Sequence, residues 1–212
     1  MSEIINNDII KSNLRTYYDR EAGYRNSAGK EEWKIKERKA FYDMVAREDK
    51  KFLLEIGAGA GYDSQYFMEQ GLDVTAIDLS CEMVKVCKAR GINAHELDFY
   101  NLSTLNKKFD CIWAMNSLLH VTKLDFAEVL TNVYAALHEN GLFYMGVYGG
   151  EDSEKNWVNE LYDTPRFFSF YSEAKLKEAI PDVFEIISFK QYDVGRHVDF
   201  QSVIMRKNNV KT

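Results

Sequence analysis

Cysteine and histidine are scarce in this sequence, and their spacing excludes two kinds of site. The three cysteines, Cys81, Cys87 and Cys111, are an odd number, and no two of them form a C-x-x-C pair. They predict buried free thiols in a reducing compartment and exclude a disulfide framework. No metal site can be read from the histidines, because all four are scattered along the chain: His95, His120, His138 and His197.

The sequence also lacks a long apolar run, a signal peptide and an excess of positive charge. No stretch is long enough to cross a bilayer, and the polar opening Met-Ser-Glu-Ile-Ile-Asn-Asn-Asp is unlike a leader. These absences predict a cytoplasmic protein with no membrane partner. A net charge of −6 makes a broad basic face for nucleic-acid phosphates unexpected. The sequence does not indicate an oligomeric state.

The composition is that of an ordinary globular protein, with one glycine-rich stretch. A length of 212 residues, 46% of them hydrophobic, favours a single domain with a sizeable core. Residues 52–56 read as a buried strand, followed by Gly57, Gly59, Gly61 and a helix-like segment. Glycine lets the backbone turn sharply and a ligand come close. The free N–H groups of the helix would face that ligand. Dinucleotides and S-adenosylmethionine both bind to this kind of bend.

Two details of the stretch favour S-adenosylmethionine. Tyr62 occupies the place of the third glycine in the dinucleotide fingerprint G-x-G-x-x-G. Glu55 would place negative charge near a pyrophosphate, whereas it suits a ligand with an ammonium and a sulfonium. The stretch resembles motif I of the class I S-adenosylmethionine-dependent methyltransferases. The resemblance implies that the methionine end of the cofactor lies on the acid and the glycine loop: Glu55, Gly57, Ala58 and Gly59.

Two further acids follow predicted strands. Asp78 ends the second strand, where its two oxygens match the vicinal hydroxyls of a ribose. A carboxylate that stabilises the next helix dipole is the alternative for Asp78. By resemblance, Asp98 would accept from the adenine amine and Phe99 would contact the ring; Asp98 as a plain loop cap is the alternative. Cofactor contacts are also expected at four positions beside these acids and after the fourth strand: Leu79, Met83, Met115 and Asn116.

The segment around the fourth strand resembles the same family. The family commonly reads F-D-x-I where this strand starts and L-x-H in the loop that follows it, and residues 109–112 and 118–120 match. His120 is the candidate general base; packing beside the cofactor is its alternative role. The Asp/Asn-Pro-Pro-aromatic loop of amino-methylating DNA enzymes is missing, since Asn116 is followed by Ser117. A small-molecule acceptor is therefore expected before a peptide or protein.

Residues 1–50 are polar and helix-like, and they predict a helical lid in front of the sheet, with a plain packing helix as the alternative. Tyr18 is expected to contact the cofactor and Tyr24 the substrate. The domain proper would span 51–206, with a tail at 207–212. Arg166 could hold a substrate carboxylate. The remaining residues expected around the substrate lie beside the fifth strand and in the aromatic run after it: Tyr148 and Tyr171.

Strand-like and helix-like segments alternate along the chain, which predicts an α/β fold. The last two β-rich runs, 183–189 and 197–205, predict a closing hairpin. The resemblance implies a Rossmann-like, seven-stranded, mostly parallel sheet of order 3-2-1-4-5-7-6. Strand 7 would be antiparallel, helices would cover both faces, and an N-terminal helical cover would precede the sheet.

The resulting hypothesis is an enzyme that transfers a methyl group from S-adenosylmethionine to a small molecule and releases S-adenosylhomocysteine. The methyl group would move by in-line displacement. Correct positioning of the two reactants would supply most of the rate enhancement. Three alternatives remain. One is a peptide or protein methyltransferase. Another is a non-catalytic module that binds S-adenosylmethionine or S-adenosylhomocysteine. The third is a nicotinamide oxidoreductase, against which Glu55 and Tyr62 argue.

Overall fold

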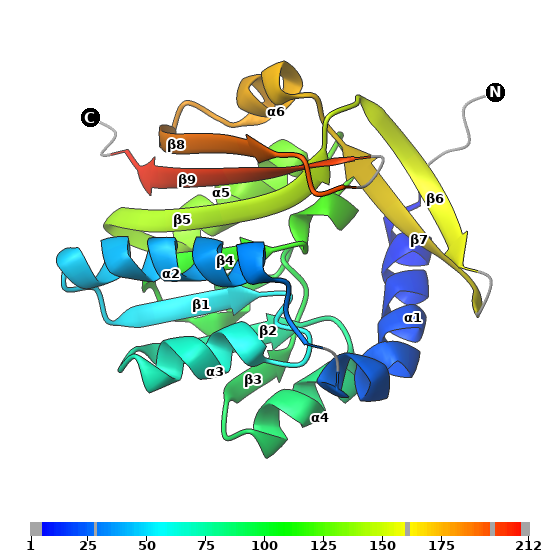
Figure 1. Ribbon diagram of the computed structural model, residues 1–212, viewed down its shortest axis with the longest axis horizontal. Coiled ribbons are helices and arrows are strands. Elements are labelled where there is room, and N and C mark those ends of the chain that lie inside the picture. The colour runs from blue at the N-terminus through cyan, green and yellow to red at the C-terminus, as the bar shows by residue number, and fades with distance from the viewer. Residues whose placement is uncertain (1–5, 28, 160–161, 196–197, 209–212) are drawn as a thin grey trace.

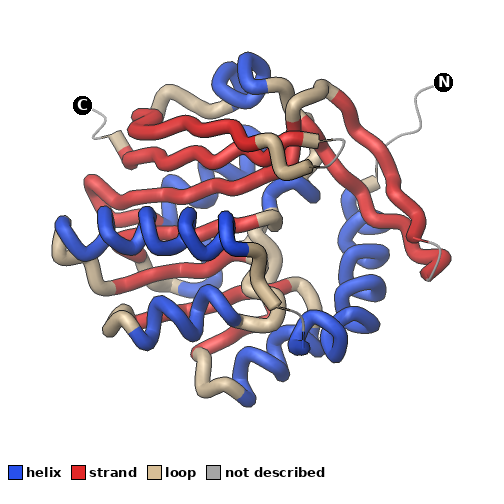
Figure 2. Tube along the Cα trace, in the orientation of Figure 1, coloured by secondary structure: helices blue, strands red, loops and turns tan. Residues whose placement is uncertain are grey.

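A computed structural model describes residues 6–27, 29–159, 162–195 and 198–208. His197 lies outside the described residues. The core of the fold is a seven-stranded sheet of order β3-β2-β1-β4-β5-β9-β8 (Figures 1 and 2). Its strands are β1 (Phe52–Ile56), β2 (Asp73–Asp78), β3 (Asn93–Glu96), β4 (Phe109–Met115), β5 (Leu137–Gly149), β8 (Phe184–Tyr192) and β9 (Asp199–Lys207).

The strand order confirms the predicted topology. Counted within this sheet alone, β8 is the sixth strand and β9 the seventh, so the order is 3-2-1-4-5-7-6. The first five strands pair in parallel, and β9 runs antiparallel to both β5 and β8. Carboxyl ends of neighbouring parallel strands meet at one edge of a sheet, which is where open α/β sheets bind ligands.

Helices cover both faces of the sheet, because successive residues of each buried strand point to opposite sides. Leu53 packs on one face with Phe41 and Phe67, whereas Leu54 packs on the other with Val129. The first face carries α2 (Glu32–Arg47), α3 (Tyr62–Glu69) and α4 (Cys81–Ala89); the second carries α5 (Phe126–Ala136) and α6 (Glu173–Ala179). Two short 3-10 turns, η1 (Leu102–Leu105) and η2 (Leu118–His120), lie in the connections around β4.

The first helix, α1 (Asn7–Ser27), stands apart from this layered body, beside the open edge of the sheet (Figure 1). The tyrosine-rich stretch 17–24 does not interrupt it, although its apolar period breaks there. Leu14, Tyr17 and Ala22 are buried against α4 and the hairpin described next. Tertiary packing therefore keeps this segment helical where its own pattern is weak.

A separate hairpin forms where the sequence predicted a polar loop and an aromatic run. It consists of β6 (Ser153–Asn159) and β7 (Tyr162–Phe170), paired antiparallel outside the main sheet. Gly150 N donates to the Tyr171 carbonyl at 2.9 Å and closes its base. Another local signal is overridden: Asn140-Gly141 is a pair typical of a helix end, yet α5 ends at Ala136 and the pair lies in β5, which begins at Leu137.

A buried carboxylate fixes α2 to the sheet. Glu37 is 5% exposed and accepts from the hydroxyls of Tyr144, at 3.3 Å, and Tyr192, at 2.6 Å, and from Ser202. Lys190 lies 3.5 Å from the same carboxylate. These partners come from β5, β8 and β9, so one side chain connects α2 to three strands.

Replacement of Glu37 by alanine is expected to lower the free energy of unfolding by about 3 kcal/mol, because it leaves several buried hydroxyls without an acceptor. Urea unfolding of the two proteins measures the difference. Glu32 lies on the same helix but is largely exposed and pairs only with Lys36. E32A should therefore change stability by about 0.5 kcal/mol or less. Equal losses in both variants would contradict the assignment.

Candidate active site

The glycine bend after β1 lies at the carboxyl edge of the sheet. Gly57 N and Ala58 N donate to the Ile77 carbonyl at 2.9 and 3.0 Å, which joins the bend to β2. Gly57 has φ +72°, and a β-carbon there would collide with the Ser117 side chain. Gly59 has φ +55° and faces open space, so a ligand can come close to the backbone at this point.

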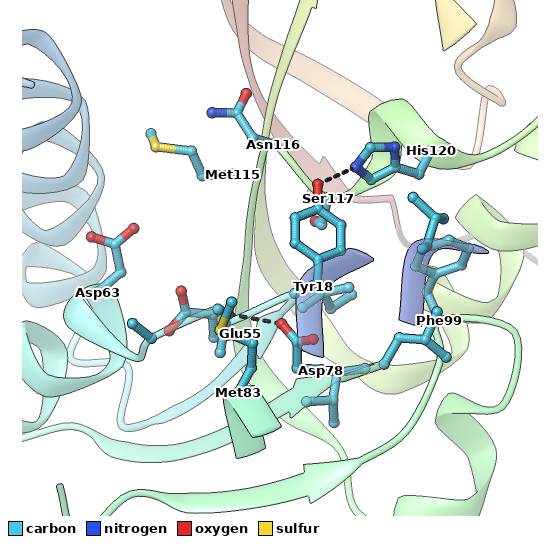
Figure 3. A pocket seen from close by; sticks show the side chains of 18 of the residues that line it. Tyr18, Glu55, Asp63, Asp78, Met83, Phe99, Met115, Asn116, Ser117 and His120 are labelled. Carbon is cyan, nitrogen blue, oxygen red and sulfur yellow. Dashed lines mark hydrogen bonds between the residues drawn. The ribbon is translucent and has the colours of Figure 1, made fainter. Parts of the chain in front are cut away.

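A cavity of about 290 Å³ opens beside this bend, between the strand ends and α1 (Figure 3). Its wall contains every residue that the sequence predicted for the cofactor, and His120. These residues are Tyr18, Glu55, Gly57, Ala58, Gly59, Asp78, Leu79, Met83, Asp98, Phe99, Met115 and Asn116. Their individual roles remain predictions, but the fold brings them to one place from six separate segments.

Asp78 is held rigidly at the end of β2. One carboxylate oxygen accepts from Gly59 N at 2.8 Å and the other from Ser80 N at 2.9 Å. Burial raises the pKa of Asp78, and these two backbone donors oppose that rise. A carboxylate has about four lone-pair positions. Two therefore remain for a pair of hydroxyl donors, as the ribose prediction requires.

Asp98 makes the contacts of a loop cap, which the sequence left as its alternative role, and has one partner on α1 that was not predicted. One oxygen accepts from Tyr100 N at 3.0 Å and Asn101 Nδ2 at 2.7 Å, and the other pairs with Lys11 at 2.9 Å. The Lys11 ammonium also lies 4.1 Å from the centre of the Tyr100 ring. The carboxylate therefore combines a loop cap with an ion pair to α1, and it joins the first helix to this end of the cavity.

Glu55 is 4% exposed and accepts a hydrogen bond from the Ser64 hydroxyl. Burial, and next the charge of Asp63, raise the pKa of Glu55 well above its usual value. Asp63 is itself paired with Lys30 and with Arg38, the latter at 3.0 Å. A cationic ligand beside Glu55 would supply the counter-charge that the protein does not.

The raised pKa of Glu55 makes two pH effects testable. In the ligand-free protein Glu55 binds a proton more tightly than in the unfolded chain, so stability should fall as pH rises from about 4.5 through the raised pKa. A ligand ammonium favours the carboxylate, so S-adenosylhomocysteine should bind more tightly as pH rises and should release a proton. Calorimetry in two buffers of different ionisation enthalpy measures that proton. E55Q should remove both effects; an unchanged proton release in E55Q would contradict the prediction.

His120 and Tyr18 meet at the other end of the cavity. Nδ1 of His120 lies 2.6 Å from the Phe167 carbonyl, which can only accept, so Nδ1 carries the proton. Nε2 then accepts from the Tyr18 hydroxyl at 2.7 Å (Figure 3). Burial, with the charges of Arg166 and Arg25, lowers the pKa of His120 to about 3. With both nitrogens bonded and the ring held neutral, this arrangement does not favour the predicted base role.

Four residues that the sequence placed around the substrate do not line this cavity. Tyr24 is 68% exposed, on the solvent side of α1. Tyr148 packs edge-on against Phe200, with ring centres 5.6 Å apart. Tyr171 is buried against the Phe126 ring. Arg166, the fourth, lies over the ring of Tyr17, 4.2 Å from its centre. Tyr148 and Tyr171 pack against neighbouring rings, because β5 and the segment before α6 run along the core there.

The sequence analysis also missed several residues in the cavity wall. Lys11 and Arg25 lie two helical turns on either side of Tyr18, so a helix reaching from 7 to 27 would have placed all three on one face. Lys30 comes from the segment that leads into α2, and Lys34 from the first turn of that helix. The described residues contain no cluster of ligating side chains that could hold a metal ion. Within the same residues, no helix is long and apolar enough to cross a membrane.

Comparison with known proteins agrees with this geometry. Residues 53–141 match the family model described as "Methyltransferase domain". No curated protein sequence matches the chain. Among solved structures, the 1,6-didemethyltoxoflavin-N1-methyltransferase of Burkholderia thailandensis superposes with a TM-score of 0.75 at 20% identity, over 99% of this chain and 93% of that one. It is described with bound 1,6-didemethyltoxoflavin and S-adenosylhomocysteine.

Two other structures are similar. DhpI in complex with S-adenosylhomocysteine gives a TM-score of 0.74 at 20% identity, over 96% of this chain and 99% of that one. The magnesium protoporphyrin IX methyltransferase of Synechocystis PCC 6803 gives 0.67 at 12% identity, over 98% and 100%. The chain therefore shares the fold of these methyltransferase structures, and residues 53–141 match a methyltransferase domain.

Proposed function

We propose that the chain methylates a small molecule, with S-adenosylmethionine as donor and S-adenosylhomocysteine as product. The observation that carries the small-molecule part is the position of α1, which lies over the cavity and is joined to its far wall. Lys11 pairs with Asp98, and Tyr18 bonds to His120. A cavity closed in this way suits a compact acceptor better than a polypeptide. The toxoflavin and porphyrin enzymes named above also act on small molecules.

The cofactor fits the residues present. Gly59 leaves room for close approach, and Asp78 has acceptor capacity left. Among the described residues Glu55 forms no ion pair, and Ser64 is its hydrogen-bond donor. Asn116 Oδ1 and Ser117 Oγ line the cavity as buried atoms without a hydrogen-bond partner among the described residues. When bound, the cofactor supplies a methyl group on a positively charged sulfur.

The residues of the chain would then bind the cofactor, orient it against the acceptor and shield both from water. We assign the ammonium to Glu55, the ribose to Asp78 and the adenine to Asp98 and Phe99. Residues 1–50 act as the lid over the domain at 51–206. Orientation of two reactants in one site can supply about 7–11 kcal/mol of the barrier. No base is required for a nucleophile that arrives unprotonated, which is consistent with the neutral, fully bonded His120.

A screen for released S-adenosylhomocysteine tests the proposal. Purified protein and S-adenosylmethionine are incubated with libraries of small metabolites and, separately, of peptides. We expect turnover with one or a few small molecules. Turnover on peptides alone would favour the protein methyltransferase. Tight binding of S-adenosylhomocysteine without turnover in either library would favour a non-catalytic binding module.

A further inference from the structure

The two ends of the cavity differ in charge. Its cofactor end holds the carboxylates Glu55, Asp78 and Asp98. The other end, around Tyr18, has positive charge instead, from two arginines on different elements. Arg25 of α1 lines the cavity and lies 4.9 Å from the centre of the Tyr18 ring. A cationic cofactor would bind near the acids, so the arginines are left facing the acceptor.

Arg166 approaches the same point from β7, one layer behind the cavity wall. Its guanidinium lies 4.2 Å from the centre of the Tyr17 ring and 5.1 Å from that of Phe168, and Phe168 in turn packs on His120. In the described part of the chain, no carboxylate lies within ion-pair distance of Arg166, and its Nε is buried without a hydrogen-bond partner. A half-buried guanidinium without a counter-ion is costly to desolvate.

Arg25 is also poorly neutralised. Its nearest carboxylate is that of Glu21, at 3.6 Å, which is longer than a hydrogen bond. Its Nε is buried without a hydrogen-bond partner among the described residues. Two guanidinium groups therefore converge on Tyr18. Among the described residues, the carboxylate paired with either of them is that of Glu21, and the charge of Asp78 reaches Arg25 from a longer distance.

A polar group from a third element faces the same end. Ser117 is 8% exposed and lines the cavity between Asn116 and η2, and its hydroxyl has no hydrogen-bond partner in the described residues. A buried polar atom of this kind normally has a partner. Its hydroxyl can donate to an oxygen of a ligand.

We propose that Arg25 and Arg166 form a subsite for an anionic group of the methyl acceptor, such as a carboxylate, beside Tyr18 and Ser117. Arg25 contacts the anion from the cavity wall, and Arg166 supplies the second positive charge from behind. The inference rests on the proposed function and narrows it: the acceptor is an organic oxyanion at neutral pH. A guanidinium suits this task, because its planar donors match the geometry of a carboxylate.

Binding measurements on the full chain saturated with S-adenosylhomocysteine test the subsite. Benzoate and phenylphosphonate are the anionic probes, and benzamide is the uncharged probe. We expect the anions to bind roughly tenfold more tightly than benzamide, as a charge-assisted hydrogen bond predicts. R25M and R166M should each remove most of this preference, R25K should keep part of it, and rising salt should weaken it.

Arg20 provides the matched control, since it lies on α1 and reaches β7 through Thr164 at 3.4 Å. R20M should leave the preference unchanged. The proposal is overturned if neither anion binds, if benzamide binds as tightly, or if R25M and R166M both keep the preference. Binding of S-adenosylhomocysteine is recorded for each protein. Normal binding without anion preference refutes the subsite alone, whereas absence of binding in the unmodified protein refutes the proposed function.

Discussion

Replacement of Asp78 by alanine is expected to weaken the binding of S-adenosylhomocysteine about a hundredfold. The carboxylate is positioned by Gly59 N and Ser80 N and has two acceptor positions left for a ribose. A charge-assisted hydrogen bond is worth at least about 1.5 kcal/mol, so the loss of two costs about 3 kcal/mol, which corresponds to a change in affinity of about a hundredfold. Titration calorimetry on the two proteins measures the effect.

Asp73 offers a control on the same strand. It begins β2, is exposed, and has only a long ion pair with Lys107 at 3.5 Å. D73A should bind S-adenosylhomocysteine as the unmodified protein does. If D78A bound it with unchanged affinity while remaining folded, the ribose assignment would be wrong and the cofactor would have to lie elsewhere in the cavity.

Replacement of Gly57 by alanine is expected to have the largest effect on both stability and binding. The residue has φ +72°, which strains any side chain, and its new β-carbon would collide with the Ser117 side chain. Relief of that collision has to move either the glycine bend or the loop after β4, and both line the cavity. A loss of about 2–4 kcal/mol in the free energy of unfolding and loss of detectable cofactor binding should follow.

Gly71 is a control position, because a side chain there would cause backbone strain without a collision. Its φ is +88°, yet a β-carbon there would have no heavy atom within 4 Å. G71A should therefore cost about 1 kcal/mol by strain alone and should bind S-adenosylhomocysteine normally. Urea unfolding and calorimetry on both variants give the comparison. A G57A protein as stable as G71A, with intact binding, would show that the bend tolerates displacement and plays no part in the site.

The gathering of Glu55, Asp78 and the glycine bend at one edge of the sheet could be predicted because its signals are local. Glu55 and Asp78 each stand at the end of a buried strand, and parallel pairing brings such ends to one edge without knowledge of distant contacts. Gly57 and Gly59 could also be recognised from the sequence. A sharp turn with positive φ favours glycine whatever distant residues pack beside it.

The way in which α1 covers the cavity could not be predicted, because it depends on contacts between distant segments. The pair of Lys11 with Asp98, and the hydrogen bond of Tyr18 to His120, join residues far apart in the chain. β6 was missed for a different reason. None of its described side chains is buried, so the sequence lacks the apolar alternation by which a strand is recognised. The end of α5 is hard to predict, because Leu137 follows Val133 and Tyr134 at helical spacing yet begins β5.

The closed base of the β6–β7 hairpin has a consequence for how new specificities can arise. Because Gly150 and Tyr171 are hydrogen-bonded to each other, the chain leaves and returns at one point between β5 and α6. Residues 151–170 thus form an insertion between β5 and α6. It lies outside the region 53–141 that matches the methyltransferase model. A graft of another hairpin at this junction would exchange Arg166 and Phe168 and would keep the glycine bend and Asp78. It would also have to supply a new surface for α1 and a new acceptor for His120, which now bonds to the Phe167 carbonyl.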